Sequence, residues 1–125
     1  MAQVKALAIS EAVRVDARRV DDIVNELGEN AAQNVIGLAL EQLAGAMTAT
    51  DEAYQKGDLA AAAGHAGRLS RLAWQIGLVS LAGVAMDLGS CVERRDTIGL
   101  TAVHARLMRV GNRSLTAIWD CSAFG

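Results

Sequence analysis

No proline interrupts the 125 residues of this chain, and that absence constrains its fold more than any other feature. Proline ends or kinks helices because it lacks an amide hydrogen and its ring clashes with the preceding turn. The chain is also 52% hydrophobic, with many Ala and Leu residues that favour helices, and only 3% aromatic. Because aromatic side chains are enriched in strands, their scarcity supports the prediction of an all-α protein.

Glycines and short polar clusters divide the chain into five segments in which apolar residues recur at the helical spacing of 3.6 residues. The predicted helices cover approximately residues 10–27, 30–55, 58–77, 78–95 and 96–119. Connections this short make neighbouring helices antiparallel, so the last four predict an antiparallel up-and-down four-helix bundle over about 30–119. The N-terminal helix of about 10–27 is expected to lie across it, within a single domain of residues 1–125. A loose tail is expected from Cys121 onward.

The distribution of charge argues against two classes of partner. The formal net charge is −2, and acidic and basic residues are interspersed, so the sequence shows no cationic stripe for nucleic acid or an anionic membrane. Apolar runs are broken well before the ~20 residues that a membrane span needs, and the N-terminus lacks the pattern of a secretory signal. We therefore expect a cytoplasmic protein that binds neither nucleic acid nor membrane.

The two cysteines, Cys91 and Cys121, lack the spacing of metal ligands. In a reducing compartment, isolated cysteines of this kind serve as small apolar packing residues, because disulfides are rare there. The chain also lacks paired carboxylates, a Cys-His pair and a phosphate-binding loop. We predict no metal site, no cofactor and no hydrolase chemistry.

The segment 58–77 carries an unusual side opposite its apolar stripe. The stripe consists of Ala62, Ala66, Leu69 and Ala73. At 100° per residue, the opposite side brings together small, cationic, amide and aromatic side chains: Gly64, Gly67, Arg68, Arg71, Trp74 and Gln75. Two glycines inside a helix cost about 1 kcal/mol each relative to alanine, so we expect a close approach that offsets them. Either a partner's backbone lies near this side, or the glycines abut a neighbouring helix of the same bundle or arose there by neutral drift.

The two histidines differ in their predicted surroundings. His65 falls beside the apolar stripe of its segment, which favours a partly buried packing residue and leaves a reactive role as the alternative. His104 lies next to Val103 on the last segment and has no carboxylate or cysteine at ligand spacing. We expect His104 at the surface.

The order of segments from about Val20 to Trp119 resembles the histidine phosphotransfer (Hpt) domain of two-component phosphorelays. That domain is a helical bundle whose exposed histidine relays a phosphoryl group between aspartates. Its motif begins a helix with Asp, continues with Ala-His about nine residues on, then Leu and Lys-Gly, and ends with Leu-Gly before the next helix. The residues that match it are Asp58 and Leu59 at the start, Leu69 in the middle, Ile76 and Gly77 at the end, and Leu81 and Leu88 beyond.

The same register places Ala66-Gly67 at the Ala-His pair and Ser70-Arg71 at the Lys-Gly pair. Glycine has no nucleophile, and a serine hydroxyl supplies no cation, although Arg68 or Arg71 could supply one. His65 lies two residues before the acceptor position, about 200° around the helix. The resemblance therefore implies a degenerate Hpt domain that binds a receiver domain or histidine kinase without relaying phosphate.

A second resemblance lies at the N-terminus. Arg14-Val15-Asp16 and Arg19-Val20-Asp21, continuing to Gly28-Glu29, are similar to the opening of the dimerisation helix of chemotaxis histidine kinases. Such helices pair into a four-helix bundle between two subunits. This resemblance implies a dimeric helical hairpin with extra helices.

Three functions follow from these patterns. In the first, the face of Gly64, Gly67, Arg68, Arg71, Trp74 and Gln75 binds a response regulator receiver or a histidine kinase as a pseudo-phosphotransferase. In the second, His65 is the nucleophile of a working phosphotransferase, since one histidine suffices when the partner supplies the aspartate and Mg²⁺. In the third, the chain is a structural dimerisation module, and the glycines form the seam of a homodimer.

Overall fold

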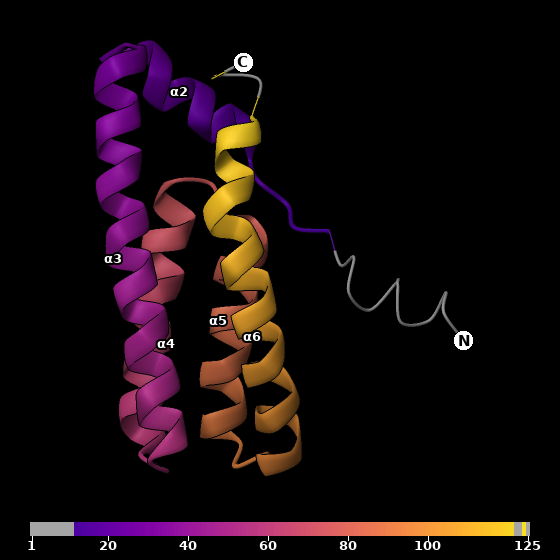
Figure 1. Cartoon of the computed structure of the whole chain (residues 1–125). Coiled ribbons are helices and arrows are strands. Elements are labelled where there is room, and N and C mark those ends of the chain that lie inside the picture. The colour runs from indigo at the N-terminus through magenta and orange to yellow at the C-terminus, as the bar shows by residue number, and fades with distance from the viewer. Residues whose placement is uncertain (1–11, 122–123, 125) are drawn as a thin grey trace.

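The computed structural model describes residues 12–121 and Phe124 (Figure 1). This part of the chain is helical and contains no strand. The helices are α2 (Ala17–Leu27), α3 (Glu29–Gln55), α4 (Leu59–Gln75), α5 (Val79–Glu93) and α6 (Thr97–Ala117), and a short 3₁₀ turn, Ile118–Asp120, follows α6. The prediction of an all-α protein is confirmed. Within the described ranges, no helix has the length and hydropathy needed to cross a bilayer.

Four long helices lie side by side, and α2 lies across one end of them (Figure 1). The chain descends α3, ascends α4, descends α5 and ascends α6. Helix α4 contacts both α3 and α5, and α5 contacts α6, whereas α3 and α6 touch at fewer positions. The α4–α5 connection and the α5–α6 connection therefore lie at opposite ends of α5.

Aspartates begin three of the helices, because a carboxylate can accept hydrogen bonds from the free amides of a first turn. Asp58 accepts from the Ala61 amide at 3.2 Å, and Asp96 accepts from the Gly99 amide at 2.9 Å. The segments predicted from the sequence begin at Asp58 and at residue 96, in agreement with these two caps. Asp16 caps α2 by accepting from the amides of Arg18 and Arg19.

The first helix begins later than the sequence predicts. Helix α2 starts at Ala17, residues 12–16 have no regular structure, and Ser10, the predicted start, lies outside the described residues. The Asp16 amide donates to Gly77 O in the α4–α5 connection at 2.7 Å, and the Arg14 amide donates to the Ser80 hydroxyl in the first turn of α5. Since these amides have partners elsewhere in the fold, the helix gains nothing by extending toward them. We call residues 12–16 the strap.

Small residues on α4 allow its neighbours to pack closely around a shared apolar core. The predicted inward stripe is fully buried: Ala62, Ala66, Leu69 and Ala73. Each of the five described helices contributes fully buried apolar side chains, and so do Leu78 before α5 and Ile118 after α6. The largest are Val20, Ile36, Leu43, Leu69, Leu78, Leu81, Leu88, Leu107, Val110 and Ile118. The predicted direction of α4 is therefore confirmed, since its leucine and alanine side faces the core.

A glycine on α6 marks the closest approach of α6 to α3. Gly111 is buried, and a Cβ built on it would lie 2.6 Å from the sulfur of Met47 on α3. Any side chain at position 111 would therefore displace the end of Met47. This packing role for a glycine was anticipated on α4, at Gly64 and Gly67, but it occurs on α6.

Candidate functional site

The side of α4 that the sequence singled out faces away from the core. We call this surface the α4 outer face: Gly64, Gly67, Arg68, Arg71, Trp74 and Gln75. Trp74 leaves 62% of its surface exposed, Arg68 and Arg71 are exposed, and Gly67 is half-buried. A large aromatic side chain this exposed is unusual for a residue with no partner, because its burial would be favourable.

Neither glycine of the α4 outer face packs against another helix. A Cβ at Gly64 would meet nothing within 4 Å. A Cβ at Gly67 would meet only the Nη1 atom of Arg71, at 3.7 Å, which is an ordinary van der Waals contact. The expectation that they abut a neighbouring helix of the same chain is therefore wrong. The open space at Gly67 is bordered by the Arg71 guanidinium, which reaches back one helical turn.

Ser70 serves the packing of α4 against α5. It is buried, and its hydroxyl donates to the carbonyl oxygen of Ala82 at 3.0 Å. In the Hpt register this is the position of the lysine, so the side chain there holds two helices together and provides no charge. The cations of the α4 outer face are those of Arg68 and Arg71.

His65 lies half-buried on α4, as its position beside the apolar stripe predicts. It forms no hydrogen bond with a described residue. Two residues of helix separate it from Gly67, so the imidazole leaves the helix about 200° away from that position. The structure therefore does not bring His65 to the centre of the α4 outer face.

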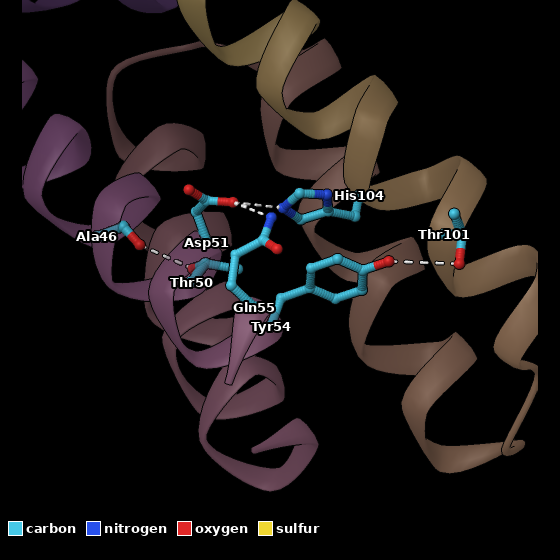
Figure 2. Close-up of polar contacts among 7 residues, drawn as sticks. All are labelled: Ala46, Thr50, Asp51, Tyr54, Gln55, Thr101 and His104. Atoms are coloured by element: carbon cyan, nitrogen blue, oxygen red, sulfur yellow. Dashed lines mark hydrogen bonds and ion pairs between the residues drawn. The ribbon is translucent and has the colours of Figure 1, made fainter. Parts of the chain in front are cut away.

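His104 lies in a polar cluster between α3 and α6 (Figure 2), and the prediction that it lies at the surface is wrong. Its Nε2 atom is 2.8 Å from Oδ1 of Asp51, and its ring stacks on Tyr54 with centroids 3.9 Å apart and an interplanar angle of 11°. Because a carboxylate only accepts, Nε2 carries the hydrogen. Tyr54 in turn donates from its hydroxyl to Thr101 on α6 at 3.3 Å.

Substitution of His104 by alanine should therefore destabilise the fold by about 2–3 kcal/mol, because it removes a charge-assisted hydrogen bond and a stacked ring from a buried site. Asp51→Asn is the matched control. It keeps an oxygen that accepts from Nε2 and should cost less than about 1 kcal/mol. Urea denaturation of the two variants measures the difference. If the two variants lose the same free energy of unfolding, the stacking on Tyr54 contributes little and the charge of Asp51 dominates.

The cysteines show no sign of reactivity. Cys91 is buried and Cys121 half-buried, and both are free thiols. Burial raises the pKa of the Cys121 thiol, and the carboxylates of Asp21 and Asp120 raise it further. A thiol that stays protonated is a weak nucleophile and a poor metal ligand. In the part of the chain that the structure describes, no three His, Cys, Asp or Glu side chains gather where they could hold a metal.

Two features near the α4 outer face escaped the sequence analysis: the strap, and the bond from Arg19 Nε to the carbonyl oxygen of Gln75 at 2.8 Å. Both contacts join segments that lie far apart in the sequence, so no pattern of neighbouring residues predicts them. Comparison with known proteins finds no relative: no family model matches the chain, and no significant match occurs among curated proteins or solved structures.

Proposed function

We propose that this protein is an Hpt-like signalling protein that binds a receiver domain or a histidine kinase through the α4 outer face and does not itself relay phosphate. In this proposal α3, α4, α5 and α6 form an antiparallel up-and-down four-helix bundle, and α2 covers one end. The helix contacts and the alternating direction of the four helices support that arrangement.

The observation that carries the proposal is the place of Gly67. It lies on the outer side of α4, where the Hpt register puts the phosphoryl acceptor, and only the Arg71 guanidinium borders it. A helix that kept this shape while losing its nucleophile would still dock the same partner. The half-buried position of His65, about 200° away, argues against that histidine as a substitute acceptor.

The side chains around Gly67 are of the types that anchor interfaces. Trp and Arg dominate the residues whose truncation weakens protein complexes most, and Trp74 and Arg71 are both exposed. The absence of a Cβ at Gly64 and Gly67 lets a partner's backbone approach α4 closely. Together these features support docking at the α4 outer face.

Titration of the purified protein against the receiver domains and histidine kinases of its own organism tests the proposal. At least one should bind, and Trp74→Ala or Arg71→Glu should weaken it by about 30-fold or more, which corresponds to ~2 kcal/mol. Arg94→Glu provides the matched control, since it makes the same charge change at the α5–α6 connection and should leave the affinity unchanged. Circular dichroism should show the same helicity for all variants.

Two results would contradict the proposal. One is that no receiver domain or histidine kinase binds. The other is that a partner binds with the same affinity after both Trp74→Ala and Arg71→Glu. A dimer in light scattering whose formation depends on Trp74 would favour the structural dimerisation module instead.

A further inference from the structure

The strap is held to the α4–α5 connection and the start of α5 by backbone hydrogen bonds, and Val13 and Val15 pack against the core, whereas the Arg14 side chain is exposed. Asp16 N donates to Gly77 O at 2.7 Å, and Arg14 N donates to the Ser80 hydroxyl at 2.7 Å. The Ser80 amide returns a bond of 3.4 Å to Arg14 O. Because these bonds use main-chain atoms of residue 14, the Arg14 guanidinium takes no part in holding the strap.

Trp74 borders two depressions together with the strap and the start of α2. One, of ≈370 Å³, is bordered by Asp16, Arg19, Trp74, Gln75, Gly77 and Val79. The other, of ≈620 Å³, is bordered by Trp74, Val79 and residues 14–18. Residues from the strap or from α2 therefore supply part of the wall of each hollow that the exposed indole borders.

Exposed arginines lie near this indole. Arg14 and Arg18 border the larger hollow together with Trp74, and Arg68 and Arg71 precede Trp74 on α4, Arg71 by one helical turn. Within the described part of the chain, none of the four forms an ion pair. Since the net charge of the chain is −2, this gathering is not a general property of its surface.

Two carboxylates border the same hollows as these arginines but form no ion pair with them in the described part of the chain. Asp16 accepts hydrogen bonds from the first amides of α2, so its charge interacts with the start of that helix. Asp87 borders a separate depression that it shares with Arg14 and Arg106. Unpaired guanidinium groups beside an exposed aromatic ring attract carboxylates at close range and steer them from a distance.

We propose that the docking surface continues from the α4 outer face across Trp74 onto Arg14 and Arg18, and that the partner presents an acidic protein surface with an apolar side chain at its centre. The carboxylates of the partner pair with Arg14, Arg18 and Arg71, and its apolar side chain packs on the Trp74 indole. This inference rests on the proposed function, because it specifies the partner surface for the same site. A protein partner fits better than nucleic acid, because the 62% exposed Trp74 offers a surface for an apolar side chain and the net charge of −2 leaves no continuous cationic stripe for a phosphate backbone.

Calorimetric titration of the full chain with the double substitution Arg14→Glu and Arg18→Glu tests this inference. Affinity for the receiver domain or kinase identified above should fall by about tenfold or more, and raising the salt concentration should weaken the wild-type complex. Arg94→Glu with Arg95→Glu makes the same charge change at the far end of α5 and should change the affinity less than about twofold. Glutamate at position 18 lies in the first turn of α2, where it favours the helix, so the variant should stay folded.

The outcomes separate the inference from the proposed function. A partner that is weakened by Arg71→Glu but not by the substitutions at Arg14 and Arg18 overturns the inference and leaves the proposed function standing. If no receiver or kinase binds, the proposed function fails. Titration with a synthetic peptide of repeated Glu-Glu-Leu units then tests whether the surface of Trp74, Arg14 and Arg18 binds acidic protein segments. The inference is supported if the wild-type chain binds that peptide and the variant with Arg14→Glu and Arg18→Glu does not. No binding, or tighter binding of a DNA duplex, overturns it.

Discussion

Replacement of Gly67 by histidine should turn the protein into a phosphoryl acceptor. A ring nitrogen of the new imidazole would attack the phosphorus of an aspartyl phosphate on the receiver. The P–N bond forms, the acyl P–O bond breaks, and the aspartate leaves as a carboxylate. Radiolabel from a phosphorylated receiver that binds the chain should appear on Gly67→His at least about tenfold above wild type.

The structure has room for this substitution. The Cβ of the new residue would lie 3.7 Å from Nη1 of Arg71, so nothing has to move, and that guanidinium would face the incoming phosphoryl oxygens. Histidine is also a better helix former than glycine, so α4 should persist.

The matched control is Gly83→His, on the exposed side of α5, where a Cβ would also meet nothing within 4 Å. It should remain unlabelled, as should wild type and His65→Ala. Label on wild type that His65→Ala removes would establish the active phosphotransferase instead. A receiver that binds Gly67→His but never labels it would show that the Hpt register places the wrong residue at the acceptor position.

Substitution of Gly77 by alanine should detach the strap and destabilise the chain by about 3 kcal/mol. Gly77 has φ +82°, a conformation that costs other residues about 1–2 kcal/mol. A Cβ there would also lie 2.9 Å from the carbonyl oxygen of Asp16 and 3.2 Å from Cβ of Arg19. Because these are atoms of the main chain and its first side-chain carbon, no rotamer change relieves the overlap, and the hydrogen bonds of the strap should be lost at about 1 kcal/mol each.

Gly57→Ala isolates the contribution of the strap. Gly57 has nearly the same conformation, φ +76°, but a Cβ there would meet nothing within 4 Å, so only the backbone strain of about 1–2 kcal/mol should remain. Thermal unfolding should show a melting temperature several degrees lower for Gly77→Ala than for Gly57→Ala. Hydrogen exchange at Asp16 N should accelerate only in Gly77→Ala. Equal losses in the two variants would mean that the strap contributes nothing to stability.

The local features of the fold could be predicted from the sequence. Asp58 and Asp96 begin their helices because a carboxylate at that position satisfies free amides, a rule that involves only neighbouring residues. The inward side of α4 follows from the spacing of Leu69 and its alanines, because one periodicity fixes every direction around a helix. The outward position of Arg71 and Trp74 follows from the same periodicity.

The contacts between distant segments could not be predicted in the same way. His104 bonds to Asp51, 53 residues earlier, and only the packing of α6 against α3 brings the two together. Val103 and Ala105 flank His104 on α6, and no residue of its own segment identifies the carboxylate on α3 that it bonds to. The strap illustrates the same limit, since residues 12–16 continue a helical pattern of apolar residues yet bond to Gly77 and Ser80.

The seam between Met47 and Gly111 has a chemical consequence. The Met47 thioether is 3% exposed and lies against Gly111, so an oxidant reaches its sulfur only when α3 and α6 separate locally. Met86 on α5 is 64% exposed, so an oxidant such as hydrogen peroxide reaches its sulfur directly from solution. These two methionines should therefore differ in their rate of oxidation: Met86 reacts at the rate of the reagent, and Met47 only as often as the two helices part.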